Sequence, residues 1–220
     1  GVITKLDKAC LDQYGPYVTG CQHGVGHGIM DYFGTSKLVE ALDTCSMTTQ
    51  KRILFGCTSG VFMEYNLPII IFTNDAQSKP RKMDEKQPYA PCPSLPQKYQ
   101  ESCYYEIAEW WNNTSVFNDN FKKLGELCQS ITIEINRKSC LLGVGNLIAA
   151  RSNYVVGETT NSCGKMPNQE SKRICRSGAS WSFFSSVTYR SLAREVCADL
   201  DKNEEKKCIQ DSDLIGNGLI

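Results

Sequence analysis

The sequence predicts an all-α protein in which about six tandem helical hairpins, each stapled by a disulfide, form a solenoid or superhelix. Three observations predict this fold: the even number of cysteines, their regular spacing, and the amphipathic segments that lead into them. The first cysteines of six successive pairs step by 35, 47, 36, 35 and 34 residues, a period typical of helical repeat proteins. The pairs are 10/21, 45/57, 92/103, 128/140, 163/175 and 197/208, so that partners are 11 or 12 residues apart.

The cysteines are expected to form disulfides rather than metal sites. Their number, twelve, is even, which is typical of proteins from oxidising compartments, and no short Cys-x2–4-Cys zinc knuckle occurs. The simplest connectivity joins neighbours within each unit: Cys10–Cys21, Cys45–Cys57, Cys92–Cys103, Cys128–Cys140, Cys163–Cys175 and Cys197–Cys208. Each bond would tie the end of one helix to the second turn of the next and stabilise the hairpin by roughly 2–3 kcal/mol.

A single repeat domain is expected, and every unit is interpreted as two helices. The first helix ends at the first cysteine, as in the amphipathic segments 37–45, 121–128 and 191–197. The second begins near a proline in three units, where the missing N–H is tolerated. The units lie near residues 1–34, 35–66, 82–116, 117–152, 153–187 and 188–220. The 47-residue step indicates an insertion loop over residues 67–91, either a contact surface or a tolerated surface insertion.

In its period and cysteine pairing the chain resembles cysteine-rich αα-repeat proteins of the Sel1-like and TPR-like kind. The likeness covers most of the chain and concerns architecture alone. The paired cysteines are several residues further apart here, and the alanine/glycine/tyrosine consensus of Sel1-like repeats is missing. The resemblance implies a secreted helical superhelix that is used for binding.

Composition narrows the classes of partner. The chain has 24 basic and 24 acidic residues, which argues against a nucleic-acid or anionic-membrane binder. No apolar run approaches the ~20 residues of a transmembrane helix, and a chain that starts at Gly1 without a signal peptide is expected to be a mature or trimmed fragment. We expect a secreted, periplasmic or cell-surface protein. The sequons within residues 112–115 would make it a glycoprotein in a eukaryote.

Glycine recurs at one register of the second helices. It follows the second cysteine by three residues at Gly24, Gly60, Gly143 and Gly178, and Gly-Val-Gly occurs in two units. A glycine within a helix costs about 1 kcal/mol relative to alanine. The repetition therefore indicates close approach to a neighbouring helix, and we interpret the Gly-x-Gly segments as packing rather than as phosphate-binding loops.

The register six residues after the second cysteine has a different chemistry in each unit. Equivalent positions of a stacked array line one surface, which is usually the binding surface. A composite site is therefore expected there, for a peptide, a glycan or a small ligand in a groove. Its candidate residues at this register are His27, Met63, Glu109, Asn146 and Trp181, joined by Glu64 one residue further on and by Glu106, which replaces the glycine three residues after Cys103.

The two histidines of the chain suggest a metal. His23, His27 and Asp31 are spaced i, i+4, i+8 and share a helix face. Two such imidazoles can bind zinc or copper, and a carboxylate can complete the set. With Glu109 or Glu64 as general base, the site would be that of a metal-dependent enzyme. Two other interpretations stay open: imidazoles that only satisfy nearby acids or helix-terminal carbonyls, and a purely structural surface protein.

Overall fold

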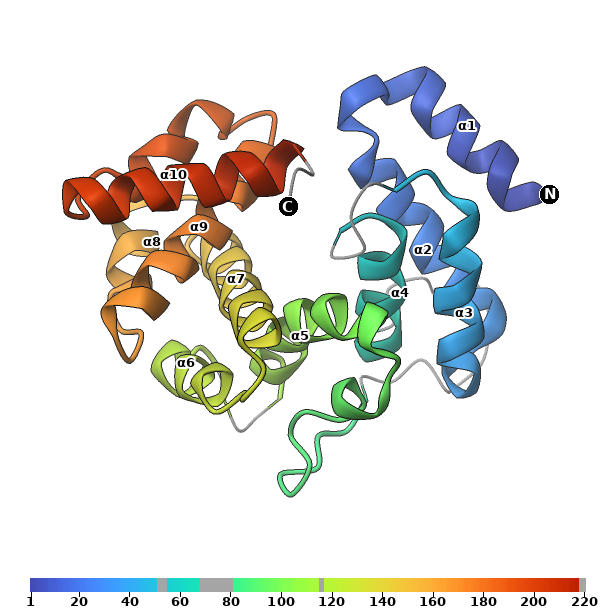
Figure 1. Cartoon of the computed structure of the whole chain (residues 1–220), viewed down its shortest axis with the longest axis horizontal. Helices are drawn as coiled ribbons and strands as arrows, with labels where there is room; N and C mark the ends of the chain where they lie inside the picture. The colour runs from blue at the N-terminus through green and yellow to red at the C-terminus, as the bar shows by residue number, and fades with distance from the viewer. Residues whose placement is uncertain (51–54, 68–80, 115–116, 218–220) are drawn as a thin grey trace. The chain divides into compact units, whose positions relative to one another are not determined.

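The structure is a computed structural model that describes residues 1–50, 55–67, 81–114 and 117–217. Every regular element in these ranges is a helix, so the predicted all-α class is confirmed. The chain divides into two compact units, Gly1–Trp110 and Trp111–Ile220, and each contains three disulfides (Figure 1). Among the described helices, none combines the length and the hydropathy needed to cross a bilayer.

All six predicted disulfides are formed. Their Cα–Cα distances lie between 5.5 and 5.9 Å, and no cysteine is free. The bonds therefore join the two segments of each hairpin, as the spacing predicts. Six intramolecular disulfides indicate an oxidising environment.

The helices follow the repeat closely. The first unit contains α1 (Val2–Tyr14), α2 (Thr19–Phe33), α3 (Leu38–Thr44), α4 (Cys57–Asn66), the 3₁₀-helix η4 (Cys92–Ser94) and all but the last two residues of α5 (Gln97–Asn112). The second unit contains α6 (Phe121–Gln129), α7 (Glu134–Arg151), α8 (Val156–Cys163), α9 (Gln169–Ser185), the 3₁₀-helix η5 (Arg190–Cys197) and α10 (Lys202–Asn217). Short 3₁₀ turns at 15–17, 35–37 and 45–47 connect elements of the first unit.

The first segment of a hairpin is not always an α-helix. Residues 191–197, expected to be an amphipathic α-helix, belong to the 3₁₀-helix η5, and the buried Ala193 and Val196 are three residues apart, as the 3₁₀ period requires. The second cysteine is the seventh residue of α5, α7, α9 and α10, which is the predicted second turn. In α2 and α4 it lies in the first turn instead. Of the expected insertion loop, residues 68–80 lie outside the described residues.

Local sequence signals set several helix ends. The side chains of Asn120 and Asn168 accept backbone hydrogen bonds at the starts of α6 and α9, which satisfies amides that have no partner within the helix. Gly34 follows α2 with a positive φ of 74°, a conformation that glycine adopts without strain. These signals explain why the helices begin and end where the repeat requires.

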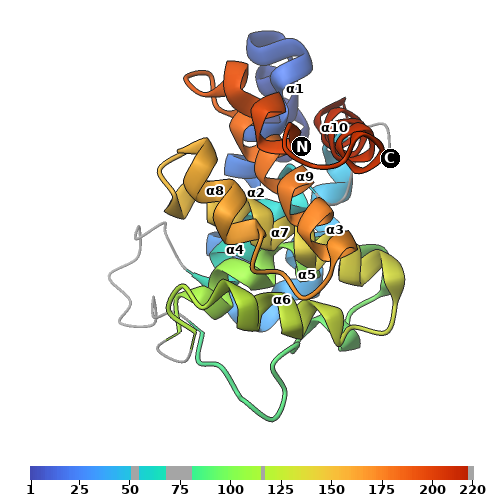
Figure 2. The same ribbon diagram turned by 90° about the vertical axis from the view of Figure 1, so that its left-hand side faces the viewer.

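One helix pair forms the centre of each unit. Helix α2 packs on α4 in the first unit, and α7 packs on α9 in the second, where the two run side by side (Figures 1 and 2). A Cβ on Gly26 would lie 2.0 Å from the carbonyl oxygen of Cys57, and one on Gly60 would lie 2.0 Å from that of His23. In the second unit, a Cβ on Gly145 or Gly178 would meet backbone atoms at 1.9 and 2.1 Å. Both pairs therefore bring helix backbones into direct contact.

The glycine prediction is confirmed at Gly60 and Gly178 and is wrong at Gly24. A Cβ on Gly24 would meet nothing within 4 Å, and the contact is made by Gly26 instead. Two residues along an α-helix correspond to about 200° of rotation. Gly24 and Gly26 therefore face different sides of α2, and only one of them can face α4.

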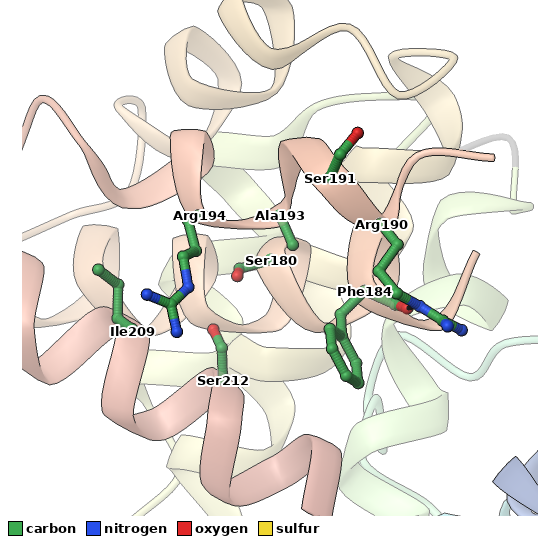
Figure 3. A pocket seen from close by; sticks show the side chains of 8 residues that line it. All are labelled: Ser180, Phe184, Arg190, Ser191, Ala193, Arg194, Ile209 and Ser212. Atoms are coloured by element: carbon green, nitrogen blue, oxygen red, sulfur yellow. Dashed lines mark hydrogen bonds between the residues drawn. The ribbon is translucent and has the colours of Figure 1, made fainter. Parts of the chain in front are cut away.

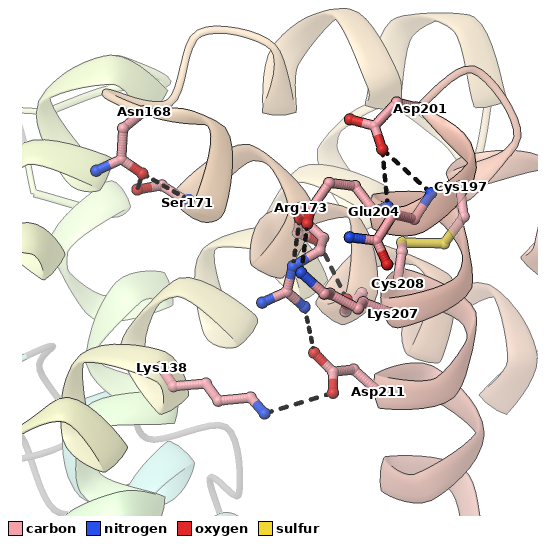
Figure 4. A network of polar contacts seen from close by, with 12 residues as sticks. Lys138, Asn168, Ser171, Arg173, Cys197, Asp201, Glu204, Lys207, Cys208 and Asp211 are labelled. Carbon is pink, nitrogen blue, oxygen red and sulfur yellow. Dashed lines mark hydrogen bonds and ion pairs between the residues drawn. A yellow bond between two sulfur atoms is a disulfide. The ribbon is translucent and has the colours of Figure 1, made fainter.

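Ion pairs hold the last hairpin of the second unit. Arg173 of α9 bonds to Glu204 of α10 through Nε at 2.9 Å and to Asp211 through Nη1, and Lys138 of α7 lies 3.5 Å from Asp211 (Figure 4). The carboxylate of Asp211 thus links three helices of this unit, α7, α9 and α10.

Candidate functional site

The two imidazoles face each other on one side of α2. His23 and His27 are one turn apart, and their Nε2 atoms lie 3.0 Å from each other. The ring centroids are 4.8 Å apart and the ring planes are inclined by 70°. The i, i+4 spacing therefore brings the two Nε2 atoms together, and the two Nδ1 atoms meet other partners.

The Nδ1 atoms bind side chains from the next hairpin. Nδ1 of His27 lies 2.7 Å from Oε2 of Glu64, and Nδ1 of His23 lies 3.1 Å from Oγ of Ser59. The Ser59 hydroxyl is also hydrogen-bonded to Oε1 of Glu106 on α5. These five side chains form a continuous polar chain to which all three hairpins of the first unit contribute.

The glycine contact between α2 and α4 positions this polar chain. Gly60 touches the backbone of His23 and His27, and Ser59 is its neighbour in sequence. Glu64 lies four residues after Gly60, on the same face of α4. Because the two helix backbones touch at Gly26 and Gly60, short side chains such as Ser59 can reach the imidazoles of the neighbouring helix.

Most of the polar chain is buried. Glu64 is 3% exposed, Ser59 4%, Glu106 5% and His27 8%, whereas His23 is half-buried and gives the chain its contact with solvent. Burial raises the pKa of Glu106 to about 8; nearby Glu109 adds to this, and the hydrogen bond from Ser59 opposes it. Burial, together with electrostatic repulsion from His27, lowers the pKa of His23 to about 4. At neutral pH both groups are therefore predominantly uncharged.

Four of the nominated residues meet in this polar chain: His23, His27, Glu64 and Glu106. The contact between His27 and Glu64 is of the kind expected for imidazoles that satisfy nearby acids. Asp31 is half-buried on α2. In the described parts of the chain, no group of three or more His, Cys, Asp or Glu side chains is arranged to hold a metal ion, so Asp31 does not complete a three-residue set.

The other nominated residues lie elsewhere on the second helices. Met63 is half-buried on α4, and Glu109 is half-buried on α5, one turn after Glu106. Asn146 and Trp181 belong to the second unit, on α7 and α9, and Trp181 stacks on Phe184 with ring centroids 6.0 Å apart.

Ser59 is the one member of the polar chain that the sequence did not single out. Serine is common on helix surfaces and carries no distinctive spacing. The available signal is register: Ser59 and His23 each follow the second cysteine of their hairpin by two residues. Comparing that register across neighbouring hairpins would have placed the two side chains on facing helices.

The second unit has the same backbone contacts with different side chains. At the positions of His23, His27 and Glu64 it carries Leu142, Asn146 and Ser182. Ser177 stands where Ser59 stands in the first unit, and its hydroxyl donates to the carbonyl of Arg173 in its own helix at 3.1 Å. The polar chain is therefore a property of the first unit.

Two cavities lie outside the polar chain. An apolar groove of about 870 Å³ is lined mainly by residues of α1 and α2, among them Leu6, Gly28 and Ile29. A cavity of about 280 Å³ in the second unit is lined by residues of α9, η5 and α10, among them Arg190 and Arg194 (Figure 3).

Comparison of the chain with protein-family models, curated proteins and solved structures found no match. The site is therefore interpreted from its own geometry.

Proposed function

We propose that this chain is an exported, disulfide-stapled α-repeat protein that binds a divalent transition-metal ion, copper or zinc, through Nε2 of His23 and Nε2 of His27. The observation that supports this most is the 3.0 Å separation of these atoms while both Nδ1 atoms bind other side chains. A neutral imidazole that donates from Nδ1 presents its Nε2 lone pair to a metal. Two such lone pairs on neighbouring rings would supply two of the ligands of a metal site.

The separation of the nitrogens suits some ions better than others. Imidazole nitrogens lie about 2.0–2.1 Å from copper or zinc, so a separation of roughly 3.0 Å corresponds to an angle near 95° at the ion. That angle fits two neighbouring positions of a square-planar copper(II) site. Tetrahedral zinc requires roughly 3.3 Å, which a small opening of the two rings provides. Water or a bound molecule would fill the other positions.

Glu64 would support the ion rather than bind it. Metal-binding histidines usually donate their second nitrogen to a carboxylate, which fixes the ring and increases its basicity. Glu64 lies 2.7 Å from Nδ1 of His27 in that arrangement. This geometry favours a binding protein over the alternative of a metal-dependent enzyme in which Glu64 is the general base.

The oxidising environment indicated by the disulfides supports a site of action outside the cytoplasm. A secreted, periplasmic or cell-surface location is consistent with six intramolecular bonds. It is also consistent with copper(II), the oxidised form of the ion.

The test is calorimetric titration of the untagged, disulfide-intact chain with copper(II) and with zinc(II). We expect one ion per chain, and we expect His27→Ala and His23→Ala to weaken binding by at least about 100-fold because each removes a ligand. Glu64→Gln should weaken it by about 10-fold or more.

The matched control is Ser177→Ala, which changes a buried serine at the register of Ser59 in the second unit and should leave the affinity unchanged. Circular dichroism of every variant establishes that it is folded. Binding of neither ion by the wild-type chain, or equal binding by wild type and a folded His27→Ala variant, would show the proposed function to be wrong.

A further inference from the structure

The three hairpins of the first unit each contribute one group to a hydrogen-bonded triad. His23 comes from α2, Ser59 from α4 and Glu106 from α5. Ser59 lies in the middle, since its oxygen is 3.1 Å from Nδ1 of His23 and is also bonded to Oε1 of Glu106. The serine is 4% exposed, so its hydroxyl proton has the half-buried His23 and the buried Glu106 as partners rather than bulk water.

A hydroxyl has a single proton, and this couples its two hydrogen bonds. When Glu106 is a carboxylate, Ser59 donates to it, and His23 must then donate from Nδ1 to the serine oxygen. When Glu106 is protonated, the acid donates to Ser59, and Ser59 donates to Nδ1 of His23. The first arrangement leaves Nε2 of His23 without a proton, and the second puts the proton of the neutral ring on Nε2.

The two arrangements differ in whether a hydrogen bond can form between the two imidazoles. His27 donates from Nδ1 to Glu64, so its own Nε2 is an acceptor when the ring is neutral. A proton on Nε2 of His23 closes the 3.0 Å gap as a hydrogen bond. Without that proton, two lone pairs face each other across the same gap, and a cation can join them.

We propose that Glu106 is a positioning residue for the histidine pair: through Ser59 it selects which nitrogen of His23 carries the proton, and thereby whether the pair can bind a metal ion. This inference rests on the proposed function. Glu106 acts on the imidazoles indirectly, because it is hydrogen-bonded to Ser59 and Ser59 is hydrogen-bonded to His23.

The surroundings of Glu106 favour its protonated form at neutral pH. Glu106 meets Ser59 of α4, and Glu109 on its own helix adds a second carboxylate; beyond Ser59 lie His23, His27 and Glu64. Burial and Glu109 both raise the pKa of Glu106. Binding of an ion therefore releases one proton from this carboxyl group in addition to any that the imidazoles lose.

The first test follows the tautomer of His23 without metal. In ¹⁵N-labelled, disulfide-intact chain, the imidazole nitrogen shifts distinguish a protonated from an unprotonated nitrogen. We expect His23 to carry its proton on Nε2 at pH 6.5 and to move it to Nδ1 as the pH rises through about 8. The change should be absent in Ser59→Ala, in Glu106→Gln and in their combination, and present in the control Ser177→Ala.

The second test follows affinity, with copper(II) held at known free concentrations by glycine. Between pH 6.5 and 8, wild-type affinity should rise about tenfold more per pH unit than that of Glu106→Gln, because wild type releases one more proton. A His23 tautomer that is constant from pH 6.5 to 9, an unchanged transition in Ser59→Ala, or equal pH slopes would overturn the inference. Absence of copper and zinc binding would instead overturn the proposed function, while a tautomer change would still support the coupling of Glu106 to His23.

Discussion

The Glu106 carboxyl group is buried beside the uncharged hydroxyl of Ser59, and burial disfavours its ionised form. Its pKa is raised to about 8 from 4.5. A carboxyl group whose pKa is higher in the folded than in the unfolded state binds more protons when folded. The stability that this provides is present below pH 4.5 and is lost as the pH rises through about 8.

Glu106→Gln should remove this pH dependence, since the amide keeps the size of the side chain and cannot ionise. Relative to wild type, the variant should become more stable as the pH rises from 4.5 to 8, by a few kcal/mol at most, at about 1.4 kcal/mol per pKa unit. Urea unfolding of both chains at pH 5, 6.5 and 8 measures the difference. A difference in free energy of unfolding that stays constant over this range would contradict the raised pKa.

At the scale of the helix, the glycine contacts decide which side chains meet. Gly26 and Gly60 let the backbones of α2 and α4 touch, and the imidazoles consequently lie within reach of Ser59 and Glu64. Gly24 and Gly28 on the same helix α2 have open space around them. Glycines in one helix therefore have two different surroundings.

Alanine substitutions separate these two kinds of glycine. Gly60→Ala would place a methyl group 2.0 Å from a backbone oxygen, and we expect destabilisation of about 1–3 kcal/mol or more together with loss of metal binding. In Gly24→Ala the new methyl group would have no neighbour within 4 Å. This variant should stabilise the helix by up to about 1 kcal/mol, with metal binding retained. Thermal unfolding and calorimetric titration measure both effects, and equal behaviour of the two variants would argue against the glycine contact as the element that builds the site.

The same contact explains which parts of the site the sequence could predict. Helix register alone nominates His23, His27, Glu64 and Glu106, but it does not say which faces of α2 and α4 meet. Asp31 shares a face with the histidines, yet eight residues correspond to about 12 Å along a helix, which separates it from His23. Ser59 has no distinctive chemistry, and the sequence signal that could have found it is the register that it shares with His23, two residues after the second cysteine.

At the scale of the whole molecule, covalent chemistry made the fold predictable. A disulfide between residues 11 or 12 apart is a local constraint, and six of them specify the hairpins before any tertiary contact is known. The exchange of an α-helix for a 3₁₀-helix at residues 190–197 was not predictable from amphipathicity, because both helices can bury Ala193 and Val196. The division into two compact units likewise depends on tertiary contacts.

The two units carry different side chains on similar helix pairs. Both contain a glycine-mediated helix pair, formed by α2 with α4 and by α7 with α9. Only the first places imidazoles at the contact, since Leu142 and Asn146 occupy the equivalent positions of the second. The second unit is thus an internal comparison for the first, with the same backbone arrangement and no ligand nitrogens at that register.

The most direct measurement is X-ray diffraction from crystals of the chain soaked in copper(II), with data collected on both sides of the copper absorption edge. We predict one strong anomalous peak in the first unit, about 2 Å from Nε2 of His23 and from Nε2 of His27, and none at the equivalent place beside Leu142 and Asn146. A map without a peak between the imidazoles, from crystals whose X-ray fluorescence shows that they took up copper, would contradict the proposed site.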